Sequence, residues 1–194
     1  MNTRDKILAA ALELFNTEGV GGQSALDIAS AMGISAGHLY YHFKGKPEIL
    51  GRLMLTHRDE IDLVTEALRD ATRCGEPNLE SLWTHVHILV EETWDARFFW
   101  RESALALGQG DLAEQARHIL KAIRGAIMDM LVALAKAGAI AGSPEVLSGL
   151  AAQMATGVVF HSHALELEGE TRSPRELIAR AAAQIMIPVS GYAA

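Results

Sequence analysis

Residues 24–46 read SALDIASAMGISAGHLYYHFKGK and predict the architecture of the amino-terminal part of the chain. Ser24, with Asp27 three residues later, is typical of a capping box at a helix start. Gly33 lies where this helix must stop, because glycine tolerates the positive φ of a tight turn. Ser35 can then cap a second helix. The pattern indicates two short helices joined by a tight turn, a helix-turn-helix.

The second of these helices has two different faces. Leu39 and Phe43 lie four residues apart, so they share one side of the helix and are expected to be buried. The residues left facing outward are Gly37, His38, Tyr40, Tyr41 and His42. Aromatic and hydrogen-bonding groups of this kind suit contacts in a DNA major groove. We therefore expect a DNA-binding domain, and the alternative is a three-helix packing unit with surface aromatics.

These motifs also carry a resemblance to a known family. LYYHFKGKPEIL at residues 39–50, preceded by DIA at 27–29 and MGISAG at 32–37, resembles the amino-terminal domain of the TetR family of bacterial transcriptional regulators. The pattern covers roughly the first quarter of the chain. The resemblance implies an all-α protein with a helix-turn-helix DNA-binding domain at 1–48. It also implies a helical effector-binding and dimerisation domain at 49–194.

The resemblance assigns roles to residues of the second helix and its flanks. The family's backbone-contact positions are occupied by Tyr40, His42 and Lys46. The base-reading positions are occupied by Ala36, Gly37 and His38, of which only His38 can hydrogen-bond a base edge. Tyr41 or the shape of the DNA is therefore expected to add specificity. In full, the predicted DNA-contact set is Ser24, Ala25, Ser35, Ala36, Gly37, His38, Tyr40, Tyr41, His42 and Lys46.

The composition points to an all-α protein with a core. The chain has 194 residues, 49% of them hydrophobic, and only 5 prolines, which excludes disorder and permits substantial burial. Ala is abundant and apolar residues recur at helical spacing nearly throughout. A charged amphipathic start, the lack of an apolar run of transmembrane length and a single cysteine, Cys74, predict a cytoplasmic protein without disulfides or membrane segments.

The net charge gives no general support for nucleic-acid binding. The chain carries a formal charge of -7, and its first fifty residues hold four basic against five acidic side chains. A basic surface is the usual electrostatic sign of DNA binding. Lys44 and Lys46 lie together at the end of the motif, so the placement of the basic side chains favours DNA binding more than the net charge does. We expect non-specific affinity for DNA to be modest and strongly salt-sensitive.

Helix start and stop signals divide the chain into about nine helices. Thr3 can cap the first helix, Gly19 ends it, and Pro47 suits the start of the fourth. Apart from the two helices of the motif at 25–43, the predicted helices span residues 3–18, 47–73, 79–95, 98–107, 112–137, 145–167 and 174–187. Pro188 is expected to stop the last of them.

All three tryptophans lie close together in the chain. Trp83, Trp94 and Trp100 fall within eighteen residues, with Phe98 and Phe99 among them. Large apolar walls with a few polar groups are what a small-molecule cavity needs. The predicted effector-binding set is Trp83, His87, Glu91, Trp94, Phe98, Phe99, Met128, Met154 and His161. The alternative is that these residues are ordinary core, and the sequence does not identify the effector.

A metal centre is a second interpretation of the histidines. His87 and Glu91 lie four residues apart and could co-ligate a metal, with His118 or His161 as a third ligand. The same side chains more often form a solvated stripe. The sequence has no nucleophile–base pair, no two-histidine metal motif and no cofactor loop. We therefore predict no catalytic residue, metal or cofactor, with a helical metal-dependent enzyme and an interaction module that no longer reads DNA as alternatives.

The last two predicted helices carry small residues that allow close helix approach. The resemblance implies that they form the two-fold interface of a homodimer, which would pair two DNA-reading heads. They could instead be the core of a monomer. The predicted interface residues are Leu147, Leu150, Met154, Val158, Leu177, Ile178, Ala181 and Ile185. Together these features predict a homodimeric repressor that a small-molecule effector releases from a palindromic double-stranded DNA operator.

Overall fold

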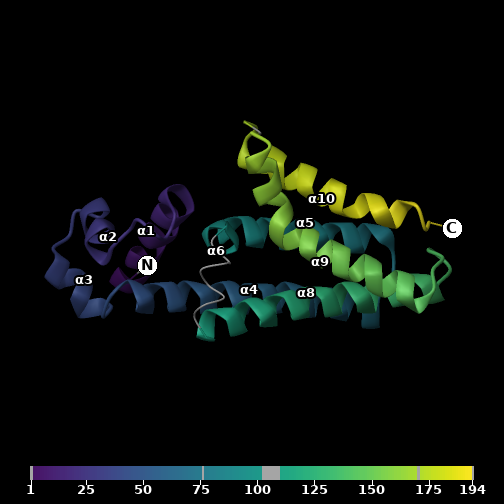
Figure 1. The fold of residues 1–194 in the computed structure, drawn as a ribbon. Helices are drawn as coiled ribbons and strands as arrows, with labels where there is room; N and C mark the ends of the chain where they lie inside the picture. Colours follow the sequence, from purple (N-terminus) through teal and green to yellow (C-terminus); the bar gives the residue numbers. More distant parts are fainter. Residues whose placement is uncertain (1, 76, 102–109, 170, 194) are drawn as a thin grey trace. The chain divides into compact units, whose positions relative to one another are not determined.

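The computed structural model describes residues 2–75, 77–101, 110–169 and 171–193. The helices in these ranges are α1 (Thr3–Glu18), α2 (Ala25–Ala31), α3 (Ala36–His42), α4 (Lys46–Cys74), α5 (Leu79–Asp95), α6 (Arg97–Arg101), α8 (Gly110–Lys136), α9 (Pro144–Leu167) and α10 (Pro174–Ser190) (Figure 1). The all-α prediction is confirmed. Of the helix predicted at 98–107, the part after Arg101 lies outside the described residues. None of these helices is both long and apolar enough to cross a lipid bilayer.

The chain folds into two compact units. The first comprises Met1–His57 and Asp95–Gln115, and the second comprises Arg58–Trp94 and Ala116–Ala194. Helix α4 contributes its amino-terminal part to the first unit and the remainder to the second. The predicted boundary at residue 48 therefore lies inside the first unit, and α6 belongs to that unit.

The first unit is a cluster of short helices around an apolar core. Helices α1, α2 and α3 pack together (Figure 1). The side chains of Ile7, Ile28 and Leu39 are fully buried. Phe15 of α1 packs against Phe98 of α6 with ring centroids 5.7 Å apart. Each of these side chains contributes about 2 kcal/mol of hydrophobic stabilisation when it is fully buried.

Asn16 joins α1 to the segment that contains α6. Its side-chain amide donates to the carbonyl of Asp95 at 2.8 Å, and its side-chain oxygen accepts from the N–H of Phe98 at 3.0 Å. Arg101 donates to the backbone carbonyl of Asn16 at 2.7 Å. These hydrogen bonds satisfy backbone groups at the start of a short helix that has few internal ones. They explain why α6 packs with α1.

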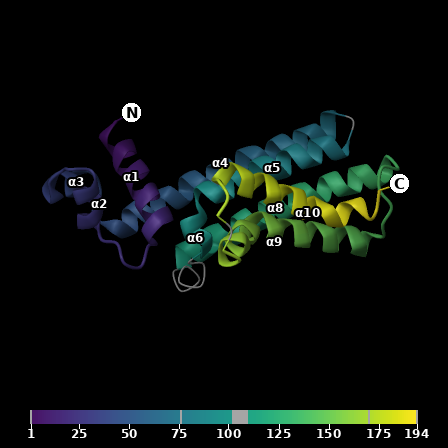
Figure 2. The ribbon, with the colours of Figure 1, turned by 90° about the horizontal axis from the view of Figure 1, so that it is seen from above.

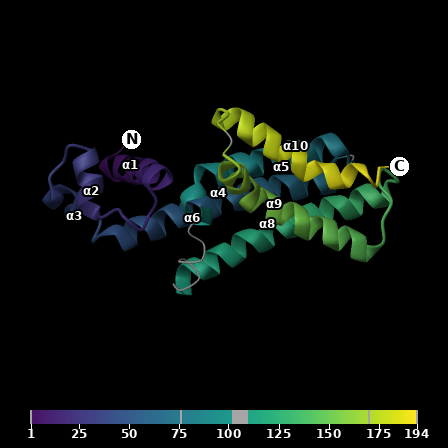
Figure 3. The same cartoon turned by 45° about the horizontal axis from the view of Figure 1, so that its top comes forward.

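The second unit is built from α5, α8, α9, α10 and the rest of α4. Figures 2 and 3 show α9 and α10 as an antiparallel pair. Gly157 allows the close approach, because a Cβ at this position would lie 2.8 Å from Cγ1 of Ile185. The buried hydroxyl of Thr93 on α5 donates to the carbonyl of Val158 on α9 at 2.9 Å. Gly157 thus lets α9 and α10 approach closely, and Thr93 links α5 to α9.

The residues predicted for the dimer interface are core residues of the second unit. Each of the eight is at most 8% exposed in the single chain: Leu147, Leu150, Met154, Val158, Leu177, Ile178, Ala181 and Ile185. Their apolar faces are already covered within the subunit, so these side chains leave little area for a partner. Helical periodicity marks the face of a helix that is buried, but it does not say whether the same chain or a partner covers it.

The structure also corrects two predictions of helix ends. Asn2 rather than Thr3 caps α1: the Asn2 side-chain oxygen accepts from the N–H of Asp5 at 2.9 Å, and the Asp5 carboxylate accepts from the N–H of Asn2 at 3.1 Å. Helix α10 does not stop before Pro188 but continues to Ser190. A proline in the last turn removes only the one hydrogen bond that its missing N–H would have made, so the helix tolerates it.

Candidate nucleic-acid interface

Helix α2 begins at a complete capping box. The Oγ of Ser24 accepts from the N–H groups of Leu26 and Asp27, at 3.2 and 3.3 Å. The Asp27 carboxylate in turn accepts from the N–H and the hydroxyl of Ser24, at 2.7 and 2.6 Å. These hydrogen bonds, chiefly that from the hydroxyl, lower the pKa of Asp27 below its usual value. The predicted cap is confirmed, and it fixes the start of the first helix of the motif.

The turn between α2 and α3 has the predicted geometry. Gly33 has a φ of 64°, in the left-handed region that favours glycine. The N–H of Ile34 donates to the carbonyl of Ala29 at 3.0 Å, which closes the end of α2. Ser35 caps α3, since its hydroxyl oxygen accepts from the N–H of His38 at 3.2 Å. Local sequence therefore determines both the turn and the start of α3.

Helix α3 buries one face and exposes an aromatic one. Leu39 is fully buried, and Phe43, which follows the last residue of the helix, is buried as well. Both burial predictions are confirmed. On the opposite side, Tyr41 is 84% exposed and Tyr40 is 49% exposed, and His38 is exposed too. A short helix held by two buried side chains thus presents two phenols and an imidazole to the solvent.

Three rings on this face contact one another. The ring centroid of His42 lies 5.4 Å from that of His38 and 5.0 Å from that of Tyr41, the latter in an edge-on arrangement. His42 is half-buried, rather than fully outward as predicted, because its neighbours partly cover it. A Cβ at the exposed Gly37 would meet no atom within 4 Å, so the backbone is open to close approach there.

The corner between α3 and α4 is tied to the start of α1. Gly45 allows the corner with a φ of 151°. The Glu48 carboxylate accepts from the N–H of Lys44 at 2.8 Å and pairs with Arg4 at 3.4 Å. The guanidinium of Arg4 also lies over the ring of Phe43, 4.3 Å from its centroid. The backbone N–H of Lys44 and the charge of Arg4 lower the pKa of Glu48.

Two members of the predicted DNA-contact set have partners within the first unit. The ammonium of Lys46 donates to the carbonyls of Val20 and Gln23, at 2.9 and 2.7 Å, and is partly buried. Ala25 is 6% exposed and lies in the core, so its side chain cannot reach DNA. For Lys46 the structure adds an internal role that the sequence did not indicate.

The predicted effector-binding residues do not form one cluster within either unit. Phe98 and Phe99 belong to the first unit, where both are buried and Phe98 packs on Phe15. The other seven belong to the second unit. Among those seven, Trp94 and Met154 are buried in its core. Both phenylalanines are thus buried residues of the first unit.

The remaining members of this set lie nearer the surface of the second unit. Trp83 is 43% exposed, and its ring lies 5.2 Å from that of His87 on the same helix. Glu91 is exposed, Met128 is half-buried, and His161 hydrogen-bonds the side chain of a glutamine in α10. Among the residues that the structure describes, no group of three His, Cys, Asp or Glu side chains is arranged to hold a metal ion.

A buried histidine that sequence reasoning did not single out lies in α4. His57 is 3% exposed, and burial lowers its pKa to about 4. The indole N–H of Trp100 donates to His57 Nε2 at 3.3 Å, so the neutral imidazole carries its proton on Nδ1. Within the described part of the chain, Nδ1 has no hydrogen-bond partner. The available signal was the position of His57 in register with the apolar Leu53 and Ile61.

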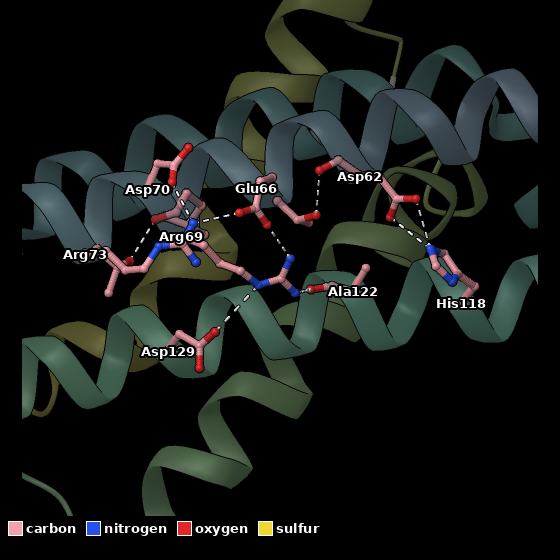
Figure 4. A network of polar contacts seen from close by, with 11 residues as sticks. Asp62, Glu66, Arg69, Asp70, Arg73, His118, Ala122 and Asp129 are labelled. Carbon is pink, nitrogen blue, oxygen red and sulfur yellow. Dashed lines mark hydrogen bonds and ion pairs between the residues drawn. The ribbon is translucent and has the colours of Figure 1, made fainter.

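A second polar set joins α4 to α8 within the second unit (Figure 4). Nε2 of His118 lies 2.9 and 3.0 Å from the two carboxylate oxygens of Asp62. Arg69 donates to the carbonyl of Ala122 at 3.3 Å and pairs with Asp129 at 3.6 Å. The contacts come from two points along α4, so they hold its second half along α8. Sequence reasoning missed them because the partners are more than fifty residues apart.

The geometry defines a class of protein: a helix-turn-helix protein whose second motif helix is capped, anchored and exposed. Comparison with protein-family models narrows this class to one family. Residues 7–53 match the bacterial regulatory proteins of the tetR family, and residues 62–194 match the TetR bacterial transcriptional repressor model. The chain therefore belongs to the TetR family of bacterial transcriptional regulators, as the motif resemblance predicts.

Curated relatives match in the amino-terminal part. The chain is 36% identical over 61 residues to the HTH-type transcriptional regulator SrpR of Pseudomonas putida, covering 31% of this chain and 29% of that protein. It is 37% identical over 54 residues to the probable HTH-type transcriptional regulator YttP of Bacillus subtilis, covering 28% of this chain and 26% of that protein. These matches thus span less than a third of the relatives' own lengths.

Solved structures match over the whole chain. A TetR-family transcriptional regulator from Marinobacter aquaeolei VT8 is 25% identical with a TM-score of 0.87, and the match covers 100% of this chain and 92% of that one. The ketosteroid transcriptional regulator KstR2 of Mycobacterium tuberculosis has a TM-score of 0.76 at 18% identity, with 100% and 96% covered. The second likeness shows a shared fold.

Proposed function

We propose that this protein is a one-component transcriptional regulator that binds double-stranded DNA through α3 in the cytoplasm. The observation that carries the proposal is the outward face of α3, where His38, Tyr40 and Tyr41 are exposed on a helix anchored by two buried side chains. Phenol and imidazole groups donate to phosphate oxygens or to base edges. The protein acts by binding and not by catalysis.

Base reading rests on few side chains. Ala36 and Gly37 offer only a methyl contact and close backbone approach, so His38 makes the direct hydrogen bond to a base. Tyr41, the most exposed aromatic residue of the helix, extends the contact, and DNA shape supplies the rest of the specificity. His42 and Tyr40 position the helix on the backbone.

The regulator acts as a homodimer, which pairs two α3 helices on a palindromic operator. Because the residues first predicted for the interface are core, the proposal uses the outward faces of α9 and α10. No Asp, Glu, Lys or Arg occurs from Val146 to Leu165 or from Ala181 to Ser190. Depletion of charge is typical of the centre of an interface. The exposed residues on these faces are Gly149, Gln153, Thr156, Phe160, Ala179, Ala183 and Ile187.

A small-molecule effector releases this repressor from its operator. The proposed binding region is the second unit, around the buried Trp94 and Met154. Helix α4, which contributes residues to both units, carries the change to the DNA-binding end. The effector must prefer one arrangement of α4, since equal affinity for both would shift nothing. Thermal unfolding across a compound library identifies the effector, because a ligand stabilises according to its occupancy.

DNA binding is tested with a duplex that the wild-type protein enriches from a random library. His38→Ala and Tyr40→Phe should each weaken binding to that duplex by about tenfold, the cost of one or two lost hydrogen bonds. Tyr192→Phe, at a half-exposed tyrosine near the end of the chain, is the matched control and should bind like the wild type. Unchanged affinity for both α3 variants would refute the assignment of this face.

The homodimer is tested by sedimentation. Phe160→Glu and Ile187→Glu, at side chains 38% and 63% exposed, should convert the protein to monomers, since each introduces a charge that the interface would bury. Leu63→Glu, at a 74% exposed position on α4, is the control and should leave the dimer intact. A dimer that survives both α9 and α10 substitutions would contradict the proposed surface.

A further inference from the structure

Lys46 has an environment that a simple phosphate-contacting lysine does not need. Its ammonium donates to the carbonyls of Val20 and Gln23, at 2.9 and 2.7 Å. Both carbonyls belong to the α1–α2 loop, residues 19–24, which ends at the cap of α2. The same Val20 carbonyl also accepts from the N–H of Gln23 at 3.3 Å. The Lys46 side chain thus hydrogen-bonds two carbonyl groups of the loop.

The position of Lys46 in the chain makes this contact a bridge. It is the first residue of α4 and directly follows the corner glycine, Gly45. Its side chain therefore links the end of the helix-turn-helix to the loop that precedes it. Lys44, two residues earlier, shows the contrast: its side chain is exposed and makes no hydrogen bond to the described residues, and its backbone N–H donates to Glu48. The Lys46 ammonium thus binds loop carbonyls, whereas the Lys44 ammonium is exposed.

We infer that Lys46 is a positioning residue for DNA binding, which acts by holding the α1–α2 loop and with it the start of α2. An ammonium has three donors and no acceptor, and here two donors are used by loop carbonyls. Loss of the side chain frees the loop, and α3 then loses its fixed position against α2. This inference rests on the proposed function as a DNA-binding regulator.

The two possible roles of Lys46 give different salt dependences. Removal of a phosphate contact lowers the slope of log affinity against log salt by about 0.9. Removal of a positioning contact lowers affinity at every salt concentration and leaves the slope unchanged. We expect Lys46→Met to weaken binding to the enriched duplex by about tenfold, with the wild-type slope. In the free Lys46→Met protein, the backbone N–H of Gln23 should exchange with solvent at least about tenfold faster than in the free wild type.

The design includes a charge control and a rescue. Lys44→Met removes the same charge nearby and should leave the exchange of Gln23 unchanged. Gly22 is exposed, has open space for a Cβ and does not use a left-handed φ. Gly22→Ala therefore stiffens the loop without strain. In the Lys46→Met background it should restore part of the affinity, which it could not do for a missing phosphate contact.

The outcomes separate the inference from the proposed function. Faster loop exchange, weaker binding at an unchanged slope and partial rescue support the inference. A slope reduced by about 0.9 with unchanged loop exchange overturns it and makes Lys46 a phosphate contact. If Lys46→Met does not fold, Lys46→Gln, which keeps a neutral donor, is measured in the same way. If the wild-type protein enriches no duplex, the proposed function fails first and this inference with it.

Discussion

Lowering the pH from about 7.5 to about 5 should weaken the folded state by about 2 kcal/mol through His57 alone. In the folded chain this imidazole is buried, accepts from Trp100 and has a pKa of about 4, against an ordinary value of 6.5. Burial disfavours the charged ring, and no acidic group among the described residues offsets that cost. In the interval between the two pKa values, the unfolded chain therefore binds a proton that the folded chain does not.

The sign and size of the effect follow from proton linkage. Because the unfolded state holds more protons, the free energy of unfolding is largest above the ordinary pKa and falls as the pH drops towards 4. Each unit of pKa difference corresponds to about 1.4 kcal/mol of folding stability, so the full difference between the folded and the unfolded pKa of His57 corresponds to about 3 kcal/mol. The lowered pKa values of Asp27 and Glu48 act at lower pH, since their stabilisation is lost only as pH falls below the ordinary carboxylate range.

The assay is urea unfolding followed by circular dichroism at a series of pH values. His57→Phe removes the titrating ring. Between about pH 7.5 and about pH 5, the loss in its free energy of unfolding should therefore be about 2 kcal/mol smaller than the loss in the wild type. Above about pH 7, where the wild-type imidazole is neutral in both states, the variant should be less stable, because the indole of Trp100 loses its acceptor. His38→Gln, at an exposed histidine, is the control and should follow the wild-type curve. Parallel curves for wild type and His57→Phe would refute the reasoning.

Three further predictions concern stability. Ser24→Ala removes the cap of α2 and should lower the free energy of unfolding by about 1 kcal/mol in urea, whereas the exposed Ser30→Ala should not. Gly157→Ala places a Cβ 2.8 Å from Cγ1 of Ile185 and should cost about 1–3 kcal/mol. Ile185→Val in the same chain should recover part of that loss, and no recovery would contradict the close approach. Arg69→Met breaks the contacts of α4 with α8 and should cost about 1 kcal/mol, less at high salt; an unchanged unfolding midpoint would show that these contacts contribute nothing.

The helix-turn-helix could be predicted because its signals are local. Ser24 and Ser35 accept from N–H groups two or three residues ahead, and Gly33 supplies the turn by its own φ. Leu39 and Phe43 are buried as their spacing predicts. Each of these features depends on at most five consecutive residues, so tertiary packing had little opportunity to override them.

The features that could not be predicted depend on distant partners. Asn16 is a polar residue at the end of an amphipathic helix, and nothing near it in the sequence shows that it meets α6 about eighty residues later. The same holds for His118, whose partner Asp62 lies fifty-six residues earlier. Apolar periodicity also cannot assign the dimer interface, because a buried helical face has the same pattern whether the same chain or a partner covers it.

The basic side chains of the first fifty residues are not equally available to a DNA backbone. Arg4 has a carboxylate and an aromatic ring as partners, and Lys46 donates to the α1–α2 loop. Lys6 and Lys44 are exposed, with no side-chain hydrogen bond in the described part of the chain. Each phosphate contact adds only about 0.9 to the salt slope, so counterion release from two lysines contributes modestly. Under the proposed function, affinity then comes from the phenol and imidazole groups of α3, whose hydrogen bonds require an accurately placed helix. In a regulator with so few available charges, a lysine that positions the motif contributes more than one that adds another charge to its surface.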